Sequence, residues 1–266
     1  MLSANAEKIL NEYFNLPFSG VEGVRCPYFN NARLRQRAQL RVLVGKGTPK
    51  EIVEEAQIIS LQYHAGIFDK TGNCCLHGDN HGRQVVPEEI RKFLIDHNLG
   101  IECSGLVTHI LRAHFLETKK IDIAKKFFKI SSKYFLRFLI TKLRPIENIS
   151  VRTYADDRNT VVVNDWTTAQ PGDVVVMLGI KIDNNRNHIL LITENKDKKI
   201  SYVHARAWSS EGKYGHGVAR GIINITNPQK GILEQEWIEL EKIGDSNETW
   251  REAVSANTVT VRRVRI

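Results

Sequence analysis

The 266-residue sequence lacks several features that would assign it to a class of protein at once. No apolar run approaches the roughly 18 residues that a membrane-spanning helix needs. The first residues have neither the basic nor the apolar segment of a signal peptide, which favours a cytoplasmic location and leaves a secreted or wall-associated one open. There is no internal repeat and no low-complexity tract. No recognised nucleic-acid-binding motif accompanies the basic residues, so we expect no nucleic-acid partner.

Cysteine is also scarce, with four residues in the chain. This number does not make a disulfide framework at this length, and a reducing compartment is the simpler interpretation. Metal-ligand residue types gather at Cys74, Cys75, His77 and His81. Their spacing is cramped and no second ligand pair is apparent, which favours a loop over a zinc site. We therefore expect no cofactor, and the metal alternative at this cluster stays open.

The net charge of +8 is concentrated in one segment. Residues 112–144 contain ten Lys or Arg and two acidic residues, whereas the rest of the chain is neutral. This basic, amphipathic and helical pattern is typical of a helix with one solvated face. The alternative is attraction to an anionic surface, either phospholipid or an acidic wall polymer.

Helical patterns dominate the first half of the chain and β patterns the second. Thr48-Pro49-Lys50-Glu51 is a capping box with proline at the first helical position, and it predicts a helix to about Tyr63. Pro87 opens another short helix to about Asp96. Helices followed by strands with short turns indicate an α+β fold with antiparallel hairpins. The predicted strands are 151–154, 159–163, 174–178, 188–193, 200–206, 218–225, 237–243 and 258–265.

Cys103 begins a predicted helix that extends to Phe115. Apolar residues recur there at helical spacing, and Asn98 and Gly100 form a turn before it. The backbone N–H groups and the positive end of the helix dipole favour a thiolate at this position. Cys103 is therefore a candidate nucleophile.

Two histidines follow on predicted neighbouring strands, His188 and His204. Nucleophile on a helix, base on a strand and orienting group on the next strand is the order found in thiol proteases. In this interpretation His188 takes the proton of Cys103, and His204 holds the His188 ring by bonding its far nitrogen.

At these residues the chain resembles the NlpC-type papain-like cysteine peptidases of bacterial cell walls. The matching segments are Pro27–Asn31, Glu102–Val107, Gln170–Val175, His188 and Val203–Ala205. The family usually has aspartate before its cysteine, where this chain has glutamate. It also has its tyrosine and cysteine much closer together, because this chain carries a long insertion between them.

The resemblance implies one papain-like domain over 1–266, with a nucleophile helix packed on an antiparallel sheet. Residues 32–98 would be a mostly helical insertion, and 170–266 the antiparallel β core. The implied activity is hydrolysis of an amide bond in a peptidoglycan peptide through a Cys-His-His site. The resemblance also places the phenol of Tyr28 close to the thiol.

The remaining candidate site residues are those expected to contact the substrate: Glu102, Ser104, Arg206 and Trp208. Two other functions use the same residues. An acyltransferase of the same fold needs the same nucleophile and base, and a non-catalytic binding module could retain the fold. The presence of Cys103, His188 and His204 together argues against the binding module.

The proposed contact between the two histidines predicts a register for their strands. Directly opposite residues of an antiparallel pair have a constant index sum. His188 opposite His204 requires a sum of 392, with a loop of three residues, 195–197, or five, 194–198. Leu190 would then lie opposite Tyr202, and Ile189 opposite Val203. A one-residue slip would send the two histidines to opposite faces of the sheet.

Overall fold

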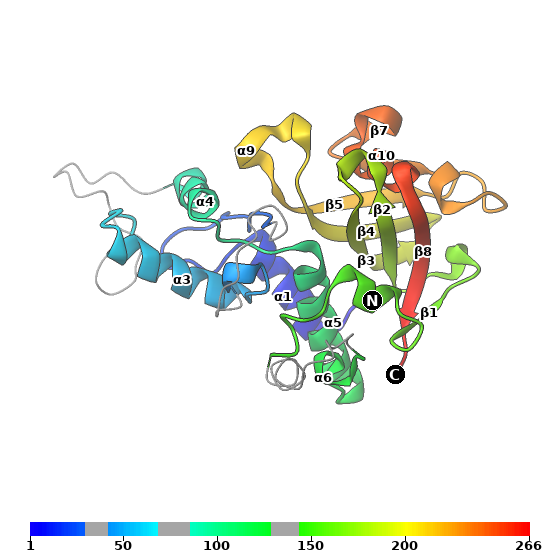
Figure 1. Cartoon of the computed structure of the whole chain (residues 1–266), viewed down its shortest axis with the longest axis horizontal. Helices are drawn as coiled ribbons and strands as arrows, with labels where there is room; N and C mark the ends of the chain where they lie inside the picture. Colours follow the sequence, from blue (N-terminus) through cyan, green and yellow to red (C-terminus); the bar gives the residue numbers. More distant parts are fainter. Residues whose placement is uncertain (30–41, 69–85, 129–143) are drawn as a thin grey trace. The chain divides into compact units, whose positions relative to one another are not determined.

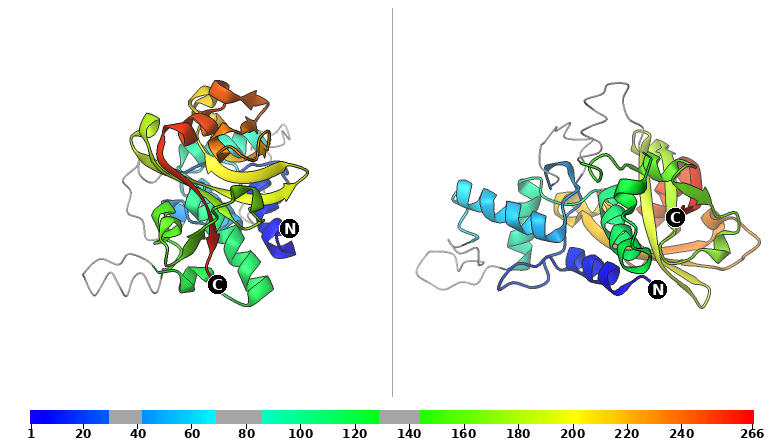
Figure 2. Two further views of the ribbon diagram at one scale, coloured as in Figure 1. Left: turned by 90° about the vertical axis from the view of Figure 1, so that its right-hand side faces the viewer. Right: turned by 90° about the horizontal axis from the view of Figure 1, so that it is seen from below.

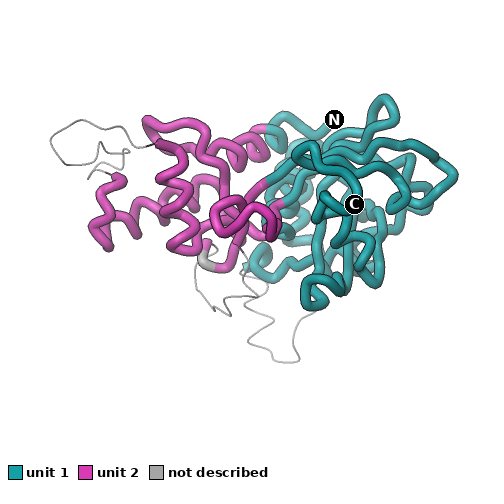
Figure 3. The backbone as a smooth tube through the Cα atoms, turned by 90° about the horizontal axis from the view of Figure 1, so that it is seen from above, with its two compact units in different colours: residues 1–7, 103–204, 219–266 teal, residues 8–102, 205–218 magenta. Residues whose placement is uncertain are grey.

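The structure, a computed structural model, describes residues 1–29, 42–68, 86–128 and 144–266. The chain forms two compact units (Figure 3). Unit 1 comprises residues 1–7, 103–204 and 219–266. Unit 2 comprises residues 8–102 and 205–218.

Unit 2 is mostly helical in its described part. Its longest helix, α3, starts as predicted, since the Glu51 N–H donates to Thr48 Oγ1 at 3.2 Å and the Thr48 N–H donates to Glu51 Oε2 at 2.8 Å. The helix that opens at Pro87 is also confirmed. The elements of this unit are most of α1 (Ala4–Phe14), η1 (Val42–Val44), α3 (Pro49–Gln62), α4 (Pro87–Asp96), η4 (Ser209–Glu211) and α9 (Gly212–Gly215).

Unit 1 combines helices with most of a single sheet. Its helices are α5 (Cys103–Lys119), α6 (Ile123–Lys126), α8 (Val151–Ala155) and α10 (Glu248–Ser255), with short turns η2 (Trp166–Thr168), η3 (Lys181–Asp183), η5 (Ile232–Glu234) and η6 (Gly244–Ser246). The strands are β1 (Thr160–Val162), β2 (Val174–Ile180), β3 (Arg186–Lys196), β4 (Lys199–Arg206), β5 (Gly217–Asn224), β6 (Glu236–Glu239), β7 (Lys242–Ile243) and β8 (Ala256–Val264).

The strands form one antiparallel sheet in the order β1-β8-β2-β3-β4-β5-β6-β7. The strands β2 to β7, which are consecutive in the chain, are also neighbours in the sheet. The exception is β8, which returns from the end of the chain and pairs with both β1 and β2. Figures 1 and 2 show β8 curving along its length beside β2. The α+β class is therefore confirmed.

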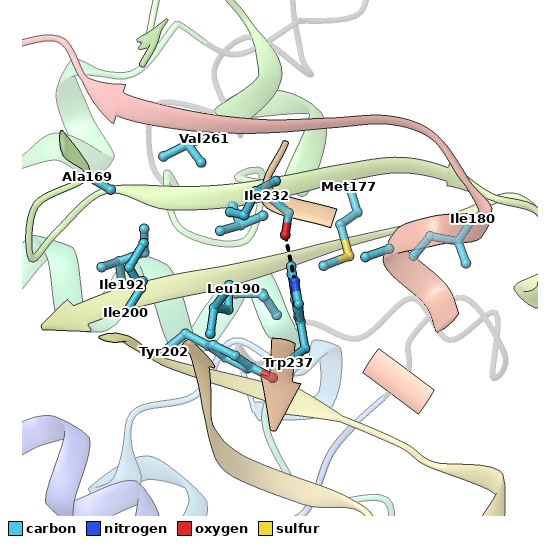
Figure 4. Packing of buried hydrophobic residues seen from close by; sticks show 13 residues of the cluster. Ala169, Met177, Ile180, Leu190, Ile192, Ile200, Tyr202, Ile232, Trp237 and Val261 are labelled. Atoms are coloured by element: carbon cyan, nitrogen blue, oxygen red, sulfur yellow. Dashed lines mark hydrogen bonds between the residues drawn. The ribbon is translucent and has the colours of Figure 1, made fainter. Parts of the chain in front are cut away.

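A large apolar cluster covers one face of this sheet (Figure 4). It includes Leu190 and Ile192 of β3, Tyr202 of β4 and Trp237 of β6, and the Trp237 indole N–H donates to the Ile232 carbonyl at 2.9 Å. Because side chains alternate along a strand, His188 and His204 leave the sheet on the same face as these residues. The imidazole rings of His188 and His204 therefore lie on the same face of the sheet as the apolar cluster.

The register between β3 and β4 differs from the prediction. Lys196 lies opposite Lys199 and Glu194 opposite Ser201, an index sum of 395, with a two-residue turn at Asp197 and Lys198. This odd sum alone would separate the histidines. A β-bulge at Thr193 shifts the register, so that Ile192 lies opposite Tyr202 and Leu191 opposite Val203, a sum of 394.

The bulge restores the face that the site needs. With a sum of 394, His188 and His204 are diagonal and not directly opposite neighbours. Aromatic side chains are long enough to contact each other at this separation. The predicted pairs Leu190–Tyr202 and Ile189–Val203 are wrong, and so are the three- and five-residue loops. Two positive φ angles explain the tighter turn, 52° at Asp197 and 59° at Lys198, because two-residue hairpins require them.

Replacing Lys198 by glycine is expected to raise the free energy of unfolding by about 0.5–1 kcal/mol. A lysine is strained at a φ of 59°, whereas glycine adopts positive φ at no steric cost. Urea denaturation measures the change. Lys196→Gly is the matched control: it lies in the strand, where glycine destabilises. Equal effects at both positions would contradict the turn assignment.

Two further predictions need correction, and one helix was not foreseen. Residues 151–154 form a helix and not a strand; Thr153 Oγ1 accepts the Ser150 N–H at 3.1 Å, so a local cap overrides the β-branched sequence. Helix α10, capped by Asn247, was not predicted. The Cys103 helix continues to Lys119, and Asp122 then caps the separate α6. Of the predicted helical insertion at 32–98, residues 32–41 and 69–85 lie outside the described residues.

Candidate active site

Cys103 is the first residue of α5 and is 6% exposed. The start of this helix is buried because α8 anchors it. Thr108 Oγ1 donates to the Ser104 carbonyl at 2.6 Å and lies 2.9 Å from the Tyr154 hydroxyl. Helix α5 also packs against β3, the strand that carries His188. The predicted nucleophile thus lies at the start of a fixed helix in the same unit as both histidines.

His188 and His204 are in direct contact. His188 Nε2 lies 2.7 Å from His204 Nδ1, and the two rings meet nearly edge to face, with centroids 5.1 Å apart. His188 is 5% exposed and His204 is fully buried. The hydrogen bond expected from the order of the residues is therefore present, although the register that produces it is different.

A third polar group, Glu239, was missed by the sequence analysis. Its Oε2 lies 3.0 Å from His204 Nε2 and accepts hydrogen bonds from the hydroxyls of Tyr202 and Thr249, each at 3.1 Å. Neither the His204 nor the Glu239 side chain has any exposed surface. The contacts form one line, from His188 through His204 to Glu239.

The signal for Glu239 lay in the alternation of β6. The strand reads Glu236-Trp237-Ile238-Glu239, with positions 237 and 239 buried. Glu239 therefore shares a face with Trp237, and a buried carboxylate requires hydrogen-bonding or charged partners. A search for polar residues in phase with a core tryptophan would have found it.

Ser104, one of the predicted substrate contacts, also lies in unit 1. Its side chain is buried, and its hydroxyl donates to the Ile149 carbonyl at 3.3 Å. The structure thus gives Ser104 a part in anchoring α5, and its contact with substrate stays a prediction.

Glu102 and Tyr28 lie in unit 2, and Glu102 directly precedes Cys103 in the chain. Glu102 forms an ion pair with Lys46, whose side chain is 4% exposed. The Tyr28 backbone bridges to Ile101, and the Ile101 N–H donates to the Pro27 carbonyl at 3.0 Å. Gly100 permits this approach, because a Cβ there would lie 2.5 Å from the Pro27 oxygen.

Arg206 and Trp208 are buried residues of unit 2, and their contact with a substrate stays a prediction. Trp208 has no exposed surface, and the Arg206 guanidinium lies 3.9 Å from its ring centroid. The same guanidinium donates to both carboxylate oxygens of Glu211. The charge of Arg206 therefore has a carboxylate partner within the protein.

The described cysteines differ in their surroundings. Cys26 is fully buried, and this desolvation raises the pKa of its thiol. The cluster Cys74, Cys75, His77 and His81 lies outside the described residues. Within the described ranges, no group of three or more His, Cys, Asp or Glu is arranged to hold a metal ion.

Part of the basic segment 112–144 can also be placed. Arg112 is engaged by Asp122 through two hydrogen bonds of 2.9 and 2.8 Å, whereas Lys119, Lys120, Lys125 and Lys126 are exposed. Binding of an anionic surface stays a prediction. In the part of the chain that the structure describes, no helix is both long and apolar enough to cross a bilayer.

Comparisons with known proteins found no match among family models, curated proteins or solved structures.

Proposed function

We propose that the protein is a papain-like cysteine hydrolase that cleaves an amide bond, with Cys103 as nucleophile, His188 as base and His204 as orienting group. The observation that carries the proposal is the 2.7 Å contact between His188 Nε2 and His204 Nδ1. It commits one nitrogen of the His188 ring to a second imidazole and orients the other nitrogen for proton transfer. A cysteine at the start of the helix packed on the same strand supplies the nucleophile.

The reaction proceeds in two steps. His188 takes the proton from the Cys103 thiol, and the thiolate attacks the amide carbonyl carbon. The C–N bond breaks as His188 returns the proton to the leaving amine, which leaves a thioester on Cys103. His188 then takes a proton from water, the hydroxide attacks the thioester, and a carboxylate and the thiol are released. The Cys103 backbone N–H is the candidate oxyanion donor.

The substrate class comes from the resemblance to NlpC-type peptidases, and a cell-wall peptide is therefore the first to test. Acyl transfer, in which an amine replaces the water of the second step, remains the alternative.

Incubation with muropeptides in ¹⁸O-labelled water tests both the bond cleaved and the second step. The expected result is two fragments, one with a single ¹⁸O in its new carboxyl group, as measured by mass spectrometry. An added amine that appears in the product instead would favour acyl transfer. Cys103→Ser, which keeps the size of the side chain, is the control. Cleavage by the control at the parent rate, or no cleavage of any muropeptide or amide by the parent, would overturn the proposal.

A further inference from the structure

Three polar groups contact the same carboxylate oxygen of Glu239. Oε2 accepts from Tyr202 and Thr249, and His204 Nε2 lies 3.0 Å from the same atom. An ionised carboxylate only accepts hydrogen bonds, whereas a neutral one must donate from one oxygen. Two hydroxyl donors on Oε2 mark it as an acceptor, so the third group in contact with it, His204 Nε2, must carry a proton.

The proton on His204 Nε2 in turn determines which nitrogen of His188 carries a proton. With its proton on Nε2, a neutral His204 presents the lone pair of Nδ1. The atom facing that lone pair is His188 Nε2, at 2.7 Å, which must then be the donor. A neutral His188 with its proton on Nε2 has its basic lone pair on Nδ1. The order of protons in both rings therefore follows from the carboxylate.

We infer that Glu239 is a positioning residue that sets the tautomers of His204 and His188, so that Nδ1 of His188 is the base. This inference rests on the proposed function for its catalytic consequence, but not for the tautomers themselves. In the first step the Cys103 S–H bond breaks and an N–H bond forms at His188 Nδ1. No other proton has to move, and the buried carboxylate stabilises the cation that results.

The fold makes room for this arrangement. Glu239 lies on β6 and Tyr202 on β4, so β5 runs between them. Continuing the pairs Ile222–Ile238 and Ile223–Trp237 by one residue places Gly221 opposite Glu239. A Cβ on Gly221 would overlap the Tyr202 ring and hydroxyl. A glycine on the middle strand therefore lets the phenol cross it and reach the carboxylate.

Imidazole ¹⁵N NMR on the full chain carrying Cys103→Ala tests the tautomers without any turnover. The chain has nine histidines, so His188→Gln and His204→Gln variants assign the signals. We expect protonated nitrogens at Nε2 of both rings and lone-pair nitrogens at Nδ1. Glu239→Leu removes the acceptor and should abolish this order, whereas Glu236→Gln, a loss of charge on the same strand, should preserve it. A His204 with its proton on Nδ1 would overturn the inference.

Activity gives the second measurement. Glu239→Gln can still accept the hydrogen bond through its amide oxygen but lacks the charge, and it should lower kcat by about 10- to 100-fold with little change in KM. Glu236→Gln should leave both constants near the parent values. A folded Glu239→Gln with the parent kcat would refute the catalytic part. If the tautomers are as stated but Cys103→Ala retains turnover, the proposed function fails and the tautomer assignment stands.

Discussion

Replacing Cys103 by alanine is expected to lower turnover by roughly 1,000-fold or more, because the variant has no sulfur to form the thioester. The fold should persist. The change removes one atom from the side chain and is expected to alter the free energy of unfolding by about 1 kcal/mol or less. Mass-spectrometric rates on the cleaved substrate measure the first effect, and calorimetric unfolding measures the second.

Cys26→Ala is the matched control, since it makes the same chemical change at a cysteine that is fully buried. Burial raises the pKa of the Cys26 thiol, so this sulfur stays protonated at neutral pH and should not react. Turnover is expected to survive in this variant. A folded Cys26→Ala without activity, or an active Cys103→Ala, would show that the nucleophile has been assigned wrongly.

Replacing Trp237 by alanine is expected to lower the free energy of unfolding by about 3–5 kcal/mol. The side chain is 1% exposed, packs within the apolar cluster and lies with its ring centroid 5.7 Å from that of Tyr202. Alanine would leave a cavity and also remove the donor to the Ile232 carbonyl. Denaturant titration measures the loss.

Two variants separate the causes of this effect. Trp237→Phe keeps most of the ring and loses the hydrogen bond, which is worth about 0.5–1.5 kcal/mol. Ile243→Ala changes a residue on the neighbouring strand that is 48% exposed, and it should cost less than about 0.5 kcal/mol. A Trp237→Ala protein as stable as the Ile243→Ala protein would show that the cluster is not the core of this unit.

Local chemistry made two helices of unit 2, α3 and α4, predictable. The capping box at Thr48 and Glu51 and the prolines at positions 49 and 87 state where helices begin, and the structure has both helices within a residue of the predicted bounds. The segment 151–154 shows the opposite case. Its β-branched residues favour a strand, yet burial of Val151 and Tyr154 and the Thr153 cap make it helical.

The candidate site was predictable only in part, for a geometric reason. Residue types and their order in the chain were enough to predict that His188 and His204 are in contact. The polar run 194–199 contains no alternation of apolar and polar residues that would indicate a register. The length of the turn and the position of the bulge could therefore not be predicted. Glu239 comes from a strand two positions away in the sheet, and its contacts depend on Gly221. Nothing within a short window of sequence connects them.

The bulge at Thr193 limits how the β3–β4 hairpin can change in length. Each residue added to or removed from the turn shifts the pairing by one, so that His188 and His204 would leave the sheet on opposite faces. Changes of two residues in the turn keep both rings on one face. Loss of Thr193 alone also keeps them there, because Ile192 would then join Glu194 and still lie opposite Tyr202. In related chains that use this pair, an odd difference in the length of the turn should therefore be accompanied by the gain or loss of a bulge.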